Sequence, residues 1–274
     1  SKDLLHSPFL FSEIDQAVER IAQARERGER VLIHGDYDVD GISGTAVLLE
    51  TMWELGIETE YFLPHRIEDG YGIASDRIHE LAAQFSLMIT VDCGTTAVEP
   101  IRFARERGMD VIVTDHHQPG TERPPAVAVL NPIREEEEYP FPDLSGSGVA
   151  YKLACALRES LLGMETPEKE GLDLAALGTV SDVVPLVEEN RTIVSWALDL
   201  LRMEQRPGIK ALLDVSYSNP RDIDSTTIGF RIGPRINALG RMSDPREAVE
   251  LLVTRDEARA YEIASEMHRL NGKR

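Results

Sequence analysis

Short apolar runs alternate with amphipathic stretches through the first half of the chain. Continuous apolar runs of three to five residues predict buried strands, and apolar positions that recur every three or four residues predict helices between them. The predicted strands cover 31–33, 60–63, 87–91, 111–113 and 126–130, and the predicted helices cover 11–28, 41–56, 75–84 and 98–108. This alternation predicts an α/β fold in which crossover helices join the strands of a parallel β-sheet.

The pattern changes in the second half of the chain. An acidic stretch with three prolines at 131–143 predicts a loop, and the apolar positions beyond it recur at helical spacing. The predicted helices cover 148–162, 171–180, 192–202, 208–213, 245–253 and 256–271. The sequence therefore predicts a parallel β-sheet with flanking helices, followed by a mostly helical segment.

We expect three segments along the chain. A lead-in helix occupies 1–29, and one domain covers 30–255, with its polar motifs at 34–182 and its helical part from about 146. A connecting helix occupies 256–274 and leads toward a further C-terminal domain.

The net charge of −19 argues against broad, nonspecific adhesion to nucleic acid, because neutralising phosphates requires clustered lysine and arginine. Any polyanion must bind at a local site. Carboxylates that hold divalent cations would lose part of this charge when the cations bind. The run Glu135 to Glu138 is interpreted as a solvated loop without a function of its own.

The chain has two cysteines, Cys93 and Cys155, in dissimilar contexts and without the spacing of zinc ligands. They indicate neither a disulfide framework nor a zinc site. No apolar run approaches the roughly 18 to 20 residues that cross a bilayer, and the first ten residues lack a leader pattern. We therefore expect a cytoplasmic protein without membrane contact.

The first polar cluster follows the first predicted strand directly. His34, Asp36, Asp38 and Asp40 place four potential metal ligands within seven residues. A bound divalent cation would offset the repulsion between these carboxylates, and the mixture of carboxylates and imidazole suits manganese, iron, zinc or magnesium. The structural alternative is an Asp-rich turn, while a calcium-binding EF-hand is disfavoured because Val47 occupies the position of its final glutamate.

Two more predicted strands end in similar residues. Asp92 follows the strand at 87–91, and His116 and His117 follow the strand at 111–113. Alone, Asp92 could be a helix cap, and Asp182, farther along the chain, could be a helix terminus. Because ligands of parallel sheets bind beyond the carboxyl ends of the strands, the joint occurrence favours a site for two metal ions, with Asp92 as a candidate bridge.

These motifs resemble those of the DHH phosphoesterase superfamily, named for the triplet that stands here at Asp115 to His117. Within that superfamily the chain is similar to the RecJ family over almost its whole length. The similarity is carried by segments 34–45, 91–94, 113–117, 146–150, 176–185 and 233–241.

The resemblance implies an exonuclease specific for single-stranded DNA that releases mononucleotides from the 5′ end, depends on manganese or magnesium, and serves DNA repair and recombination. Two cations would activate a water for attack on phosphorus, without a protein nucleophile. The ligand set implied for one cation is His34, Asp38 and Asp92, and the set for the other is Asp40, Asp92, His116 and Asp182. Asp36 and His117 would support these ligands or touch the scissile phosphate.

Substrate contacts are expected elsewhere. Segment 226–246 carries four arginines against one aspartate and predicts a phosphate-facing strip, from which the resemblance selects Arg235, Asn237 and Arg241. Arg66 is a candidate for the terminal 5′ phosphate. The backbone amides of Gly146 and Gly148, at the start of a predicted helix, could meet another phosphate. The alternative is ordinary surface arginines that pair with nearby acids.

Two other classes of function remain open. Another enzyme of the superfamily would hydrolyse an oligoribonucleotide, a cyclic dinucleotide or pyrophosphate, and a non-catalytic relative would act as a scaffold in DNA replication. The intact ligand set counts against a scaffold. By resemblance we expect single-stranded DNA as substrate, and a single-strand-binding protein and a helicase as partners. We also expect the chain to lack the two C-terminal domains of full-length RecJ-like proteins.

Overall fold

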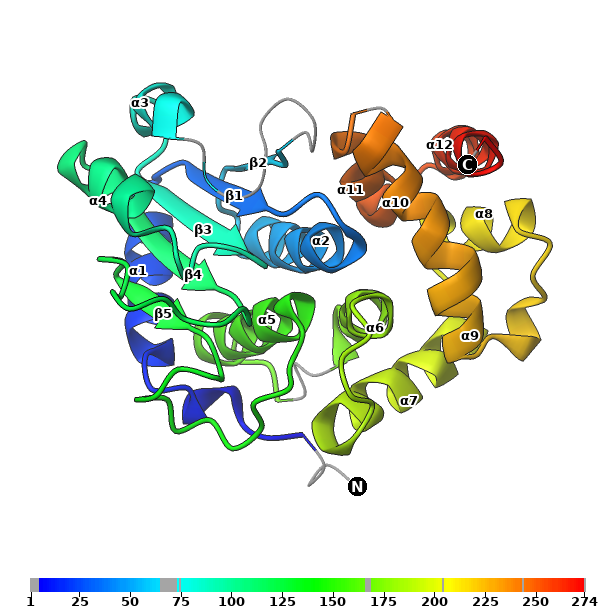
Figure 1. Cartoon of the computed structure of the whole chain (residues 1–274), viewed down its shortest axis with the longest axis horizontal. Helices are drawn as coiled ribbons and strands as arrows, with labels where there is room; N and C mark the ends of the chain where they lie inside the picture. The colour runs from blue at the N-terminus through cyan, green and yellow to red at the C-terminus, as the bar shows by residue number, and fades with distance from the viewer. Residues whose placement is uncertain are drawn as a thin grey trace.

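The computed structural model describes residues 5–64, 73, 75–165, 169–203, 205–242 and 244–273, without the side chains of residues 75, 76 and 240–242. A five-stranded parallel sheet lies at one side of the molecule, in the order β2-β1-β3-β4-β5 (Figure 1). The strands are β1 (Val31–Gly35), β2 (Thr59–Phe62), β3 (Leu87–Val91), β4 (Asp110–Thr114) and β5 (Ala128–Leu130).

Helices cover both faces of the sheet. They are α1 (Ile14–Arg27), α2 (Val39–Glu54), α3 (Ser75–Ala82), α4 (Val98–Glu106) and α5 (Gly146–Leu162). Side chains alternate along each strand, so Met88 packs in the cluster formed with α3 and α4, while Ile89 packs in the core formed with α1, α2 and α5. Burial on both faces explains the continuous apolar runs, and the predicted α/β fold class is confirmed.

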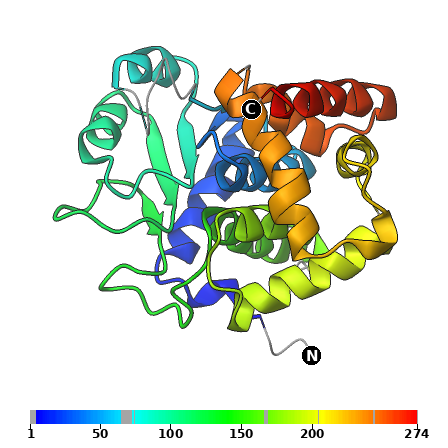
Figure 2. The same cartoon turned by 45° about the vertical axis from the view of Figure 1, so that its right-hand side comes forward.

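The second half of the chain is helical, as predicted, and curves around α2 and α5 (Figures 1 and 2). Its longer helices are α6 (Leu172–Ser181), α7 (Glu188–Met203), α8 (Pro207–Val215), α10 (Gly233–Met242), α11 (Arg246–Val253) and α12 (Glu257–Asn271). Short turns of helix are η2 (Pro8–Leu10), η4 (Pro220–Asp222), α9 (Ser225–Thr227) and the π-helical η5 (Ile228–Ile232). Side chains of α1, α2 and α12 belong to one core, so these elements do not pack as separate units.

The sequence did not predict the helical run formed by α9, η5 and α10. Gly229, Gly233, Pro234 and Gly240 are poor helix formers and hide its periodicity. The run forms nevertheless because Ile228, Ile232, Ile236 and Leu239 are fully buried on it, and this tertiary packing outweighs the weak propensity. In the described part of the chain, no helix has the length and apolar character needed to span a membrane.

Candidate metal centre

The strand order places the polar motifs at one edge of the sheet. In the order β2-β1-β3-β4-β5, the connections from β1 and β3 run in opposite directions, and parallel sheets bind ligands beyond the carboxyl ends of two such strands. The aspartates at 36–40 follow β1 and Asp92 follows β3. His116 and His117 follow β4, the next strand. The fold therefore gathers the three motifs where sheets of this kind bind their ligands.

Asp38 fixes the turn from β1 into α2. Its carboxylate caps the helix and accepts hydrogen bonds from the amides of Asp40 at 2.9 Å and Gly41 at 3.1 Å. Asp40 lies in the first turn and is 1% exposed. The cap therefore positions two carboxylates at the head of α2.

The N-terminus of α5 holds Asp40. The amide of Gly146 donates to Asp40 Oδ2 at 2.6 Å, and the amide of Ser147 donates to Asp40 Oδ1 at 2.9 Å. Such bonds are favourable because a helix N-terminus presents free amides and a positive dipole end. A Cβ atom at Gly146 would lie 2.5 Å from Asp92 Oδ1, and one at Gly178 would lie 2.3 Å from Asp40 Oδ1. Glycine at both positions lets α5 and α6 approach the carboxylates.

These bonds correct the role predicted for two glycines. The amide of Gly146 is occupied by Asp40, and the amide of Gly148 donates to Ser145 Oγ at 3.1 Å. Neither amide is free to receive a phosphate. The sequence identified the start of a helix but could not show that a buried carboxylate from α2 occupies it.

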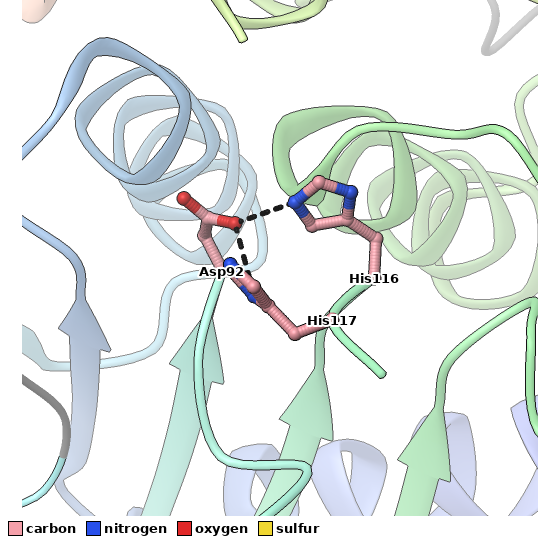
Figure 3. Close-up of side chains that lie close together, drawn as sticks. All are labelled: Asp92, His116 and His117. Carbon is pink, nitrogen blue, oxygen red and sulfur yellow. Dashed lines mark ion pairs between the residues drawn. The ribbon is translucent and has the colours of Figure 1, made fainter. Parts of the chain in front are cut away.

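Asp92 lies at the centre of the cluster. Its backbone has a φ of 60°, in the left-handed region, where aspartate is tolerated better than most residues. Its Oδ1 is buried and has no hydrogen-bond partner among the residues that the structure describes, and it lies 3.1 Å from His116 Nε2 and 3.8 Å from His117 Nδ1 (Figure 3). An unsatisfied buried oxygen between two imidazoles is an arrangement that a cation would complete.

His116 lies between the sheet half of the molecule, β1 to β5 with α1 to α5, and the helical half, α6 to α12. Besides Asp92, its Nε2 lies 3.8 Å from Asp40 Oδ2 and 3.6 Å from Asp182 Oδ2. Asp182 is the C-cap residue that follows α6, and Val183 after it has a φ of 62°, a strained conformation for a β-branched residue. The four residues expected around one cation therefore lie together in the structure.

The other expected ligand set is gathered only in part. Ligand atoms of Asp36, Asp38 and Asp92 lie within 4.8 Å of one another. His34 lies within β1, is 2% exposed, and has its Nδ1 3.9 Å from Cys93 Sγ. It is absent from the groups of close ligand atoms found among the described residues. Asp36 therefore lies with Asp38 and Asp92, and the role of His34 as a ligand stays a prediction.

Asp115 is a residue whose role the sequence did not assign. Its buried Oδ1 accepts hydrogen bonds from the amides of His116 at 2.8 Å and His117 at 3.2 Å and lies 2.7 Å from His117 Nδ1, while its Oδ2 accepts from the amide of Thr95. Asp115 therefore orients the imidazole of His117 and fixes the backbone that carries both histidines. The sequence could have indicated this role, because Asp115 directly precedes His116 and His117, and carboxylates commonly support neighbouring imidazoles.

The electrostatics of the cluster favour a positive ion. Burial, followed by the repulsion from Asp38, raises the pKa of Asp36 to about 7, and burial with Asp40 nearby raises the pKa of Asp182 to about 7. The same two causes raise the pKa of Asp38 and lift that of Asp92 well above its usual range. Asp115 differs: burial alone would raise its pKa, but His117 and the hydrogen bonds from Thr95 together lower it. The carboxylates and imidazoles therefore fit divalent cations.

The predicted substrate-binding residues are placed differently from one another. Asn237 lines a small pocket beside Asp38, Asp40 and Asp182. Arg235 packs toward α12, with its Nε 3.2 Å from His268 Nδ1 and its Nη1 donating to the carbonyl of Arg231. Arg66 lies outside the described residues, as does the side chain of Arg241.

The molecule is an α/β protein with a parallel sheet. Its carboxylates and imidazoles gather where the connections from β1 and β3 diverge, and they suit divalent cations. The chain belongs to the DHH family: the model described as "DHH family, N-terminal domain" matches residues 30–179. The resemblance seen in the motifs is confirmed.

Curated relatives carry the name single-stranded-DNA-specific exonuclease RecJ. The chain is 42% identical to the protein from Bacillus subtilis over 98% of this chain and 34% of that protein. It is 40% identical to the protein from Thermus thermophilus over 94% of this chain and 38% of that protein. It is 39% identical to the protein from Escherichia coli over 96% of this chain and 48% of that protein. The chain thus spans a third to a half of the length of these relatives.

Two solved structures share the fold. One is described as exonuclease RecJ bound to manganese, with 36% identity and a TM-score of 0.89 over 98% of this chain and 67% of that chain. The other is described as RecJ from Thermus thermophilus in complex with Mn²⁺, with 34% identity and a TM-score of 0.84 over 96% of this chain and 38% of that chain.

Proposed function

We propose that the chain is the metal-binding part of an exonuclease that hydrolyses single-stranded DNA from the 5′ end. The observation that carries the proposal is the position of His116 Nε2, within 3.8 Å of carboxylate oxygens of Asp40, Asp92 and Asp182. These residues come from the head of α2, the end of β3 and the end of α6. Such convergence of distant ligands is typical of a metal centre.

The proposed ligands divide into two groups that share Asp92. Asp40, Asp92, His116 and Asp182 form one group, and Asp38 with Asp92 forms the other, together with His34 or Asp36. Two divalent cations, manganese or magnesium, would supply an activated water and would stabilise the charge that develops on the phosphoryl oxygens. Manganese is supported by the imidazole in the ligand set and by both solved relatives, which are described as manganese complexes.

The protein's own groups would prepare this site. Asp115 holds His117 in one orientation, and Gly146 with Ser147 holds Asp40. Asp36 and His117 would touch the scissile phosphate or support the ligands. His117 has a raised pKa, because Asp115 stabilises its protonated form, and a protonated imidazole at the rim would donate to a phosphate oxygen.

Single-stranded DNA as the substrate is supported by the names of the relatives. Arg66, Arg235 and Arg241 remain proposed contacts to the DNA backbone, with Asn237 beside the metal centre. A single-strand-binding protein and a helicase remain proposed partners by resemblance. A cytoplasmic location is supported by two buried cysteines that form no disulfide.

The test is product analysis with several substrates. The chain and its Asp92→Ala variant would be incubated with Mn²⁺ and 5′-labelled single-stranded DNA, duplex DNA, a short oligoribonucleotide or pyrophosphate. We expect release of a labelled 5′ mononucleotide from single strands by the unaltered chain alone. Turnover of only pyrophosphate or the oligoribonucleotide would replace the proposal with another phosphoesterase activity.

A further inference from the structure

A small pocket lies where the sheet half of the molecule meets the helical half. Its lining residues come from the start of α2, the end of α6 and the middle of α10, and they are Asp38, Val39, Asp40, Ser181, Asp182 and Asn237. Its volume is about 20 Å³. One water needs roughly 10 to 15 Å³ of such space, so the pocket has room for one group of the size of an oxygen atom.

Ser181 has no role in the ligand set described above. It is the last residue of α6, and its Oγ is buried and has no hydrogen-bond partner within the described part of the chain. Buried hydroxyl groups are normally paired, so this one is suited to an occupant of the pocket that it lines. Because Ser181 directly precedes Asp182, its hydroxyl is fixed to the same turn as a proposed metal ligand.

Helix α10 approaches Ser181 closely. A Cβ atom at Gly233 would lie only 2.8 Å from Ser181 Oγ, so glycine is needed at this contact. Gly233 follows the π-helical segment η5 directly, and π-helical turns occur often at functional sites. Asn237 lies four residues farther along the same helix, on the same face, and reaches the same pocket. The local geometry of α10 therefore brings a serine and an asparagine together beside the carboxylates.

The two kinds of lining group have different chemistry. The carboxylates of Asp38, Asp40 and Asp182 would coordinate cations. Ser181 and Asn237 are neutral and can donate hydrogen bonds. Serine and asparagine commonly donate to phosphate oxygens in complexes with DNA. A phosphoryl oxygen beside the cations carries negative charge and accepts such bonds more strongly than a neutral group does.

We propose that Ser181 and Asn237 together bind one non-bridging oxygen of the substrate's phosphoryl group in this pocket. The inference rests on the proposed phosphodiester hydrolysis and adds a positioning contact to it. A water would occupy the pocket before the substrate arrives.

The experiment uses Ser181→Ala, Asn237→Ala and the double variant of the 274-residue chain. Ser43→Ala is the matched control, because Ser43 Oγ is also buried and unpaired within the described residues but does not line the pocket. Three quantities would be measured: the affinity for Mn²⁺, the affinity of the Mn²⁺-loaded chain for thymidine 5′-monophosphate, and hydrolysis of the p-nitrophenyl ester of that nucleotide.

We expect unchanged Mn²⁺ affinity and nucleotide binding weakened about tenfold by each single variant, as for the loss of one hydrogen bond to a charged group. The double variant should lose less than the product of the two effects, because both side chains hold the same oxygen. Nucleotide affinity in Ser181→Ala equal to that of Ser43→Ala would overturn the inference. A loss of Mn²⁺ affinity in Ser181→Ala would also overturn it and assign Ser181 to support of Asp182.

The unaltered chain separates this inference from the proposed function. If it neither hydrolyses the ester nor binds the nucleotide in Mn²⁺, the proposed function itself is contradicted, and the inference with it. If it does both, and the Ser181 and Asn237 variants match the control, only the inference is wrong.

Discussion

The sheet half and the helical half of the molecule contribute to the proposed metal centre in different ways. The sheet half supplies Asp36, Asp92 and His116 from the ends of neighbouring strands, where the spacing of the backbone fixes their separation. The helical half supplies Asp182 from the end of α6, and its position depends on how α6 packs against α2 and α5. Backbone geometry therefore fixes the positions of the residues from the sheet half, whereas side-chain packing fixes the position of Asp182 in the helical half.

The largest expected effect on metal binding and turnover comes from Asp92, which lies among the residues of the sheet half. Asp92→Ala removes the carboxylate shared by both ligand groups, so we expect binding of both cations to be lost and turnover to fall by roughly a thousandfold or more, beyond the 10- to 100-fold typical of supporting residues. Calorimetric titration with Mn²⁺ and the product assay would measure this. Asp15→Ala, at an exposed position of α1, is the control. Retention of two Mn²⁺ ions by Asp92→Ala would contradict the bridging role.

A smaller effect on metal binding is expected from Asp182, which the helical half contributes. Asp182→Ala removes a ligand from one group only, so we expect one Mn²⁺ ion to bind about 100-fold more weakly while the other binds as before. The same titration would resolve two sites of different affinity. Equal loss at both sites would show that the two halves do not contribute separately.

The contact between the halves can be tested without changing a ligand. Gly178→Ala places a Cβ atom 2.1 Å from Ser147 Oγ and 2.3 Å from Asp40 Oδ1, so α6 must move away. We expect a loss of about 1 to 3 kcal/mol of folding free energy, as for an overpacked core. Urea denaturation would measure it, and weaker Mn²⁺ binding should accompany it. Gly120→Ala, where the nearest atom would be 3.7 Å away, should change stability by less than about 0.5 kcal/mol.

The smallest expected effect is a pH dependence in the metal-free chain. The pKa values of Asp36 and Asp182, each raised from 3.8 to about 7, mean that the folded state binds protons more tightly than the unfolded state. Stability should therefore rise as the pH falls from 8 to about 5.5, opposite to the usual behaviour of paired carboxylates. Thermal unfolding in a chelator would show this as an increasing Tm.

Two comparisons complete the pH experiment. Saturating Mn²⁺ should reverse the trend, because cations bind the ionised carboxylates and stabilise the folded state. The variant Asp36→Asn with Asp182→Asn should show a weaker dependence in the chelator, and the remainder comes from Asp38, Asp92 and His117, whose pKa values are also raised. A Tm of the metal-free chain that falls steadily from pH 8 to 5.5 would contradict the proposed repulsion.

The difference between the two halves also explains what the sequence could predict. Strands such as Leu87–Val91 are read from continuous apolar runs, and parallel strands must end at a common edge, so Asp92 and His116 could be placed together in advance. Helix α10 escaped prediction because its glycines and proline mask the periodicity, and no local pattern indicates the packing that stabilises it.

The limits of prediction at the site have the same origin. The amide of Gly146 was expected to meet a phosphate but binds Asp40, which lies 106 residues earlier in the chain. Ser181 has no local feature that marks it. Its hydroxyl is buried at the contact of α6 with α10 and has no partner in the described part of the chain, which only the three-dimensional structure shows. Contacts between distant segments decide both cases, and neither propensity nor spacing encodes them.

The close approach of α2, α5 and α6 has a consequence for how this chain can vary. Cβ atoms at Gly44, Gly146 and Gly178 would lie 2.6 Å or less from atoms of Val91, Asp92 and Ser147. A library of all single substitutions, selected for Mn²⁺ retention, should therefore reject most side chains larger than alanine at these three positions, as it rejects changes at the ligands. Residues with no side chain, which touch no ion or substrate, would carry the same genetic signature as the residues that do the chemistry.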